Sequence, residues 1–151
     1  MPELRLDHVA VAVNSIKPSL DLFMHALGGQ YLMGGDNPAN FRWFQLRYPG
    51  GGKIELVEPM GDGFVARFLE TRGEGLHHIT FKTDDIHSAV AHIESRGYEL
   101  VDVSLDNAYW KEAFLRPSQA HGTVIQVAQS AAPDDVVAQH LRPSNLDDLL
   151  S

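Results

Sequence analysis

The second half of the sequence repeats the first, and this repeat constrains the fold more than any other feature. LDHVAV at 6–11 matches LHHITF at 76–81, an offset of 70 residues. GKIELV at 52–57 resembles GTVIQV at 122–127 by pattern, and a one-residue difference in length within these segments shifts the offset from 70 to 71, which places Glu55 on Gln126. Strand, helix, turn and strand recur in one order, which indicates a tandem duplication of a strand–helix–three-strand module.

We therefore predict a mixed α+β fold built of two βαβββ modules. One domain would cover 4–129, with repeats at 4–59 and 74–129 and a C-terminal tail at 130–151. Strands are predicted from alternating, β-branched segments and helices from apolar residues at helical spacing. The glycine-rich stretch 30–40 is predicted to be a loop. The predicted strands are 6–13, 41–48, 53–59, 76–81, 98–105, 111–117 and 123–129, and the predicted helices are 15–27, a short one within 60–75, and 84–96. Ser15 is a candidate N-cap.

Composition narrows the classes of function. The chain has 151 residues, 44% of them apolar, which is enough for a sizeable core. No apolar run is long enough to span a membrane, and no signal peptide is recognisable. Cysteine is absent, so disulfides and thiolate ligands are excluded, as expected for a cytoplasmic protein. The 20 acidic side chains exceed the 12 basic ones, which disfavours nucleic acid and leaves a small molecule as the expected partner.

The repeat also brings out a candidate metal site. It superposes His8 on His78 and Glu55 on Gln126, and each of these lies within a predicted strand. A polar side chain on a largely apolar strand face needs a partner or a ligand. Two imidazole nitrogens and two oxygens suit a divalent ion such as Zn, Co, Ni, Mn or Fe. We predict that these four residues share one such ion.

Other interpretations of these residues stay open. A single histidine in a strand is more often a hydrogen-bonded structural residue, and it is the repeat that favours ligation. His77 is the alternative to His78, but the alignment of LDHVA with LHHIT places His78 over His8. The remaining histidines are expected to be structural or on the surface: His25, His87, His92, His121 and His140.

Four segments resemble the vicinal oxygen chelate superfamily: LDHVAVAV, KIELVEP, FLETRGEGLHHITFKTDDI and EAFLRP. The superfamily includes glyoxalase I, extradiol dioxygenases, bleomycin and fosfomycin resistance proteins and methylmalonyl-CoA epimerase. The resemblance is strongest to the epimerase branch and covers about 4–129. It implies a curved sheet that forms a cleft around a metal held by His8, Glu55, His78 and Gln126, and it implies a homodimer. The epimerases usually carry glutamate at the last of these positions.

The epimerase resemblance implies proton removal alpha to a thioester carbonyl, aided by a divalent metal. Such an enzyme needs a base and an acid on opposite faces of the substrate. Glu55 is the first candidate, because a metal-bound carboxylate can also shuttle protons, and Glu112 is the second, although it also suits a solvent-facing strand position. The epimerases carry an acidic residue just before the second strand, but NPAN at 37–40 has none, and Asp36 is the nearest acid.

Two further classes of function remain open. A glyoxalase-type lyase or an iron-dependent dioxygenase would use the same two histidines and carboxylate. A binding or resistance protein without turnover would hold a hydrophobic ligand between aromatic side chains, for which the candidates are Trp43, Phe44, Tyr109 and Trp110. An acyl-CoA substrate would instead require a basic rim for its phosphates, for which the candidates are Arg42, Arg47, Lys111 and Arg116.

Overall fold

The structure is a computed structural model that describes residues 1–151. The chain divides into two compact units. Unit 1 contains Met1–His8 and His78–Pro133, and unit 2 contains Val9–His77 and Asp134–Ser151. The strands β1 (Arg5–Ala12) and β5 (Gly75–Lys82) each contribute residues to both units. Each unit combines strands with helices, as the sequence predicts.

Unit 2 carries the first repeat and the C-terminal tail. Its strands lie in the order β2-β3-β4-β1. β1 and β4 are parallel, whereas β3 is antiparallel to both β2 and β4. The elements after β1 are α1 (Ile16–Leu20), the π-helical η1 (Asp21–Ala26), β2 (Gln30–Asn37), β3 (Phe41–Arg47), β4 (Lys53–Pro59) and α2 (Phe64–Arg72).

Unit 1 repeats this arrangement. Its strands lie in the order β5-β8-β7-β6, with β5 and β8 parallel and the other pairs antiparallel. The elements after β5 are α3 (Ile86–Ser95), β6 (Val101–Ser104), β7 (Trp110–Leu115), the 3₁₀ turn η2 (Pro117–Gln119) and β8 (Val124–Ser130). The predicted pair of βαβββ modules in a mixed α+β fold is therefore confirmed.

The two repeats share details of hydrogen bonding at their helix starts. The Ile16 amide at the start of α1 donates to Glu58 Oε2 at 2.7 Å. The Ile86 amide at the start of α3 donates to Gln129 Oε1 at 2.9 Å. In each repeat the last strand thus caps the helix that follows the first strand. Ser15 occupies the predicted N-cap position, but its side chain makes no capping bond.

Strand alternation separates the two faces of the sheet in unit 2. Leu56 faces α1 and packs with Ile16 and Phe44, all fully buried. Val57, the next residue along β4, faces the other way and packs against Val65 of α2. Glu55 therefore lies on the α2 side of the sheet. In unit 1 the main cluster joins β8 to α3 through Val127, Ile86 and Ala89.

The prediction of a loop at 30–40 was wrong, because Gln30–Asn37 forms strand β2. Gly34 and Gly35 explain both why a loop was predicted here and why a strand forms instead. A Cβ on Gly34 would lie 2.6 Å from the backbone oxygen of Trp43, and one on Gly35 would lie 2.7 Å from the Trp43 indole nitrogen. Their composition suggests a loop, but here their lack of a side chain lets β2 and β3 approach closely.

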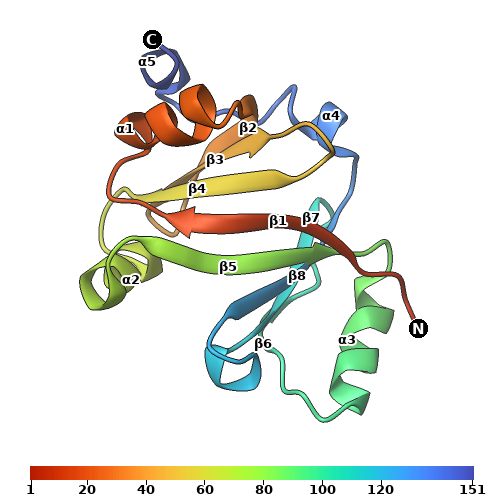
Figure 1. The fold of residues 1–151 in the computed structure, drawn as a ribbon. Coiled ribbons are helices and arrows are strands. Elements are labelled where there is room, and N and C mark those ends of the chain that lie inside the picture. Colours follow the sequence, from red (N-terminus) through yellow and green to blue (C-terminus); the bar gives the residue numbers. More distant parts are fainter. The chain divides into compact units, whose positions relative to one another are not determined.

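The tail packs on unit 2 through two short helices, α4 (Asp134–Val137) and α5 (Leu146–Leu149). α5 lies beside α1 (Figure 1), where Leu149 is buried in the cluster that contains Ile16 and Leu20. The Gly34 amide donates to the Leu141 carbonyl at 3.2 Å, so the tail also contacts the edge strand β2. None of the helices in the structure is long and apolar enough to cross a membrane.

Candidate metal and acid–base site

Unit 1 brings the two predicted histidine ligands together. His8 on β1 and His78 on β5 meet edge to face, with ring centroids 5.7 Å apart. His8 is buried, and its Nδ1 lies 2.7 Å from Asp7 Oδ2. A carboxylate on one ring nitrogen fixes the tautomer and the orientation of a metal-binding imidazole. Asp7 also lies 3.8 Å from Lys82 Nζ.

Gln126 lies in the same unit, within a chain of hydrogen bonds across β5, β8 and β7. Thr80 Oγ1 donates to Gln126 Oε1 at 2.6 Å, and Gln126 Nε2 donates to Glu112 Oε1 at 3.2 Å. Trp110 Nε1 donates to the same Glu112 oxygen at 2.7 Å. The carbonyl end of Gln126 is thus held toward β5, the strand that carries His78. A carbonyl oxygen has two lone pairs, so the bond from Thr80 still leaves one for a metal.

Unit 2 holds the fourth predicted ligand. Glu55 is buried and lies opposite Ala10 of β1 in the parallel ladder. Gln45, its partner on β3, donates from Nε2 to Glu55 Oε1 at 3.0 Å. Farther along the same face of β4, Lys53 Nζ lies 2.6 Å from Asp134 Oδ2 of the tail. The carboxylate thus lies between an apolar cluster and an ion pair.

The strand register relates the two halves of the predicted site. Ala10 pairs with Glu55, and Thr80 pairs with Gln126. A histidine precedes each of these small residues by two positions, so it faces the same side of the sheet. His8 is therefore related to Glu55 in the sequence as His78 is to Gln126.

His77 has different surroundings from His78. In unit 2 its ring packs against Phe64 and Phe68, with centroids 5.5 Å and 4.9 Å away. Burial lowers the pKa of His77 below its ordinary value, although the negative charge of Glu55 opposes this shift. An imidazole that packs against two phenyl rings has an apolar packing role.

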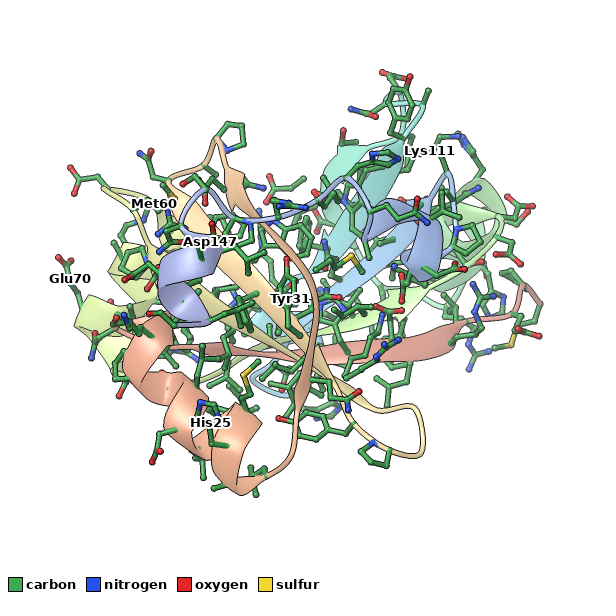
Figure 2. The ribbon with its side chains drawn as sticks, turned by 90° about the horizontal axis from the view of Figure 1, so that it is seen from above. His25, Tyr31, Met60, Glu70, Lys111 and Asp147 are labelled. Carbon is green, nitrogen blue, oxygen red and sulfur yellow. The ribbon has the colours of Figure 1, made fainter.

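His25, which was predicted to be structural or on the surface, is exposed on η1 (Figure 2).

The nearest acid to the vacant epimerase position is engaged elsewhere. Asp36 Oδ1 accepts a hydrogen bond from Arg42 Nε at 2.7 Å, and Arg42 Nη1 also donates to Glu58 at 3.2 Å. The bond from Arg42 holds the pKa of the Asp36 carboxyl below its usual value, which weakens it as a base. Arg42, a candidate for the basic rim, is thus neutralised by two carboxylates. The candidates Arg47 and Arg116 are exposed, and Lys111 is half-buried on β7 (Figure 2).

The four candidate aromatic side chains have different surroundings within their own units. Phe44 is fully buried on the α1 side of unit 2, and Trp43 packs with the α2 cluster on the other side. In unit 1, Trp110 is held by Glu112, whereas Tyr109 is 80% exposed. Phe44 is therefore a core residue of unit 2.

Three polar residues that contact the predicted ligands were not anticipated from the sequence: Asp7, Thr80 and Gln45. Asp7 precedes His8 directly, and the other two face a predicted ligand across a strand pair. Gln45 did carry a signal, since it is the only uncharged polar residue within FRWFQLRY apart from the terminal tyrosine. Its partner follows only from the β3–β4 register.

The geometry agrees with comparisons to known proteins. A family model described as the Glyoxalase/Bleomycin resistance protein/Dioxygenase superfamily matches residues 7–114. The chain belongs to this superfamily. The matched range includes His8, Glu55, His78 and Glu112 and ends before β8.

Several of the proteins to which this chain is similar are epimerases of the superfamily. It is 31% identical over 131 residues to YqjC of Bacillus subtilis, an uncharacterized protein, with 83% of this chain and 91% of the relative covered. It is 28% identical to the ethylmalonyl-CoA/methylmalonyl-CoA epimerase of Cereibacter sphaeroides, with coverage of 83% and 97%. Among solved structures, a variant of the Streptomyces coelicolor methylmalonyl-CoA epimerase in complex with 2-nitronate-propionyl-CoA has a TM-score of 0.73, 26% identity and coverage of 85% and 98%. The predicted resemblance is confirmed at this level.

Proposed function

We propose that this chain is a divalent-metal-dependent epimerase that acts alpha to the thioester carbonyl of an acyl-CoA such as methylmalonyl-CoA. The observation that carries the proposal is the duplicated register, which pairs Ala10 with Glu55 and Thr80 with Gln126, with a histidine two residues before each small partner. The epimerases among its relatives support the choice of reaction.

In this proposal the metal is held by His8 and His78 together with oxygens of Glu55 and Gln126. The donor set fits a divalent ion of the borderline or hard class, with two imidazoles and two oxygens. The contact between the two imidazole rings and the orientation of the Gln126 carbonyl toward β5 favour it. When bound, the ion would stabilise the negative charge that builds on the thioester oxygen.

The proton transfers would fall to two carboxylates, Glu55 and Glu112. Glu55 is buried and accepts a hydrogen bond from Gln45, which fixes the orientation of its carboxylate. Glu112 accepts hydrogen bonds from Trp110 and Gln126, and these fix its orientation without adding positive charge. A base and an acid on different strands can remove a proton from one face of the substrate and return it to the other.

Deuterium wash-in from heavy water into methylmalonyl-CoA tests the reaction. The metal-loaded wild-type protein is expected to exchange the alpha proton, and Glu55→Gln and Glu112→Gln are each expected to slow exchange by roughly 10²–10⁴-fold. Exchange no faster than in buffer, with metal bound, would remove the epimerase assignment. Wild-type exchange with Glu112→Gln would remove only the role of Glu112.

Metal content tests the ligand set independently of turnover. His8→Ala and His78→Ala are each expected to remove most of the bound metal after dialysis. His77→Ala is the matched control and is expected to retain it, because His77 packs between Phe64 and Phe68. Equal metal content in all three variants would refute the assignment of ligands.

The homodimer implied by the family is part of the same proposal, and sedimentation velocity tests it.

A further inference from the structure

Gln45 is a buried polar residue that the proposed function does not use. It lies in the middle of β3 and is only 4% exposed. Its amide nitrogen donates to Glu55 Oε1 at 3.0 Å, whereas its own carbonyl oxygen is buried without a hydrogen-bond partner. Burial of an unsatisfied carbonyl oxygen is unfavourable for folding. The stability of the fold therefore does not explain the carbonyl half of the carboxamide.

The second repeat shows that the strand frame does not require an amide at this position. Gln45 pairs with Glu55 across β3 and β4, and Phe114 pairs with Gln126 across β7 and β8. Phe114 thus occupies the place of Gln45 in the other module, on the same face of its sheet. Because an apolar side chain is accommodated at this position in the second module, the glutamine of the first module is best explained by its hydrogen bond to Glu55.

We propose that Gln45 is a positioning residue for Glu55. Its amide N–H fixes the orientation of the carboxylate that the proposed function assigns to the metal. Its buried carbonyl oxygen is the acceptor for an O–H donor that arrives with the bound ion or substrate. The inference rests on the proposed metal site but not on the reaction catalysed there. Residues that hydrogen-bond to a metal ligand typically change metal affinity by 10–100-fold when removed.

The test is a titration of metal-free protein with Co²⁺, in which binding is measured by calorimetry and by visible absorption. Gln45→Met keeps the length of the side chain and removes both polar ends. It is expected to weaken Co²⁺ binding by 10–100-fold. Gln129→Met is the matched control, because Gln129 is a strand glutamine that accepts from the Ile86 amide at a helix start. It is expected to leave Co²⁺ affinity unchanged and to lower stability.

Urea unfolding of the metal-free variants separates positioning from a structural role. Gln45→Met removes the buried unsatisfied oxygen but also the hydrogen bond to Glu55, so the two effects oppose one another and its stability is expected to stay close to that of the wild type. A structural role predicts the reverse, with lower stability and unchanged affinity, and that result would overturn the proposal. Gln45→Phe, which introduces the residue of the second repeat, provides the same comparison if Gln45→Met does not fold.

The outcomes separate this proposal from the proposed function. Wild-type Co²⁺ affinity in a folded Gln45→Met would overturn the role of Gln45 and leave the metal site standing. A wild-type protein that binds Co²⁺ no better than His78→Ala would overturn both. Tight Co²⁺ binding that depends on Gln45, without proton exchange into methylmalonyl-CoA, would support this proposal and remove the epimerase assignment.

Discussion

Replacement of Leu149 by alanine should destabilise unit 2. Leu149 is 5% exposed and packs in the cluster formed by Val13, Ile16 and Leu20. Burial of a leucine side chain contributes about 1.5–3 kcal/mol, and leucine-to-alanine changes in protein cores cost about 2–5 kcal/mol. α5 is only four residues long, so it can shift to fill part of the space. We therefore expect a loss of about 2 kcal/mol.

The ion pair beside this contact does not alter the estimate. Lys17 Nζ lies 2.9 Å from Asp148 Oδ1, but the two side chains are 47% and 65% exposed. An exposed pair of this kind contributes about 0–1 kcal/mol. The docking of the tail thus depends mainly on Leu149.

Urea unfolding of Leu149→Ala, compared with Leu150→Ala, measures the effect. Leu150 follows directly and is 46% exposed, so the same change there should cost less than about 0.5 kcal/mol. In a thermal scan, Leu149→Ala should lower Tm by roughly 4–8 °C for a chain of this size. Equal effects of the two substitutions would show that α5 is not docked on α1 in solution, and the packing argument would fail.

Two further predictions concern β2. Gly34→Ala should cost about 1–3 kcal/mol, because its Cβ would lie 2.6 Å from the backbone oxygen of Trp43, whereas Gly52→Ala, with open space around it, should be near neutral in the same urea assay. Asp36 has a lowered pKa from its bond to Arg42, so its stabilising contribution is present above its unfolded value of 3.8 and is lost as pH falls through the lower folded value. Wild type should therefore exceed Asp36→Asn in stability at pH 6 and progressively lose that advantage as the pH falls below 3.8, and a constant difference throughout would contradict the assignment.

Most of the fold was predictable from the sequence because strand and helix periods differ. The strand at 53–59 was predicted with the bounds that the structure has, since KIELV alternates and proline ends it. The strand at Gln30–Asn37 could not be recognised from the sequence. Its glycines are required because Trp43 on the next strand approaches them closely, and that contact is visible only in the structure. The switch from α1 to the π-helical η1 within the predicted helix 15–27 likewise has no local sequence signal.

The candidate site was predictable only where the repeat made two weak signals coincide. His8 and His78 stood out as a pair, and their rings do meet within unit 1. The hydrogen bonds that orient the ligands were not predictable, because Thr80 and Gln126 are 46 residues apart and meet through the parallel register of β5 and β8. A one-residue change in that register would turn Thr80 to the other face of the sheet.

Each module places a carboxylate on one of its last two strands and a carboxamide on the other, but the strands that carry them differ between the modules. In the first, the carboxylate of Glu55 is on the last strand and the amide of Gln45 is on the strand before it. In the second, the amide of Gln126 is on the last strand and the carboxylate of Glu112 is on the strand before it. Two bonded carboxylates would raise one another's pKa and share a proton, and two amides would carry no charge. One of each gives every module a single carboxylate at this position. In the proposed site the first module thus assigns its carboxylate to the metal, whereas the second assigns its carboxamide and keeps its carboxylate, Glu112, hydrogen-bonded to that carboxamide.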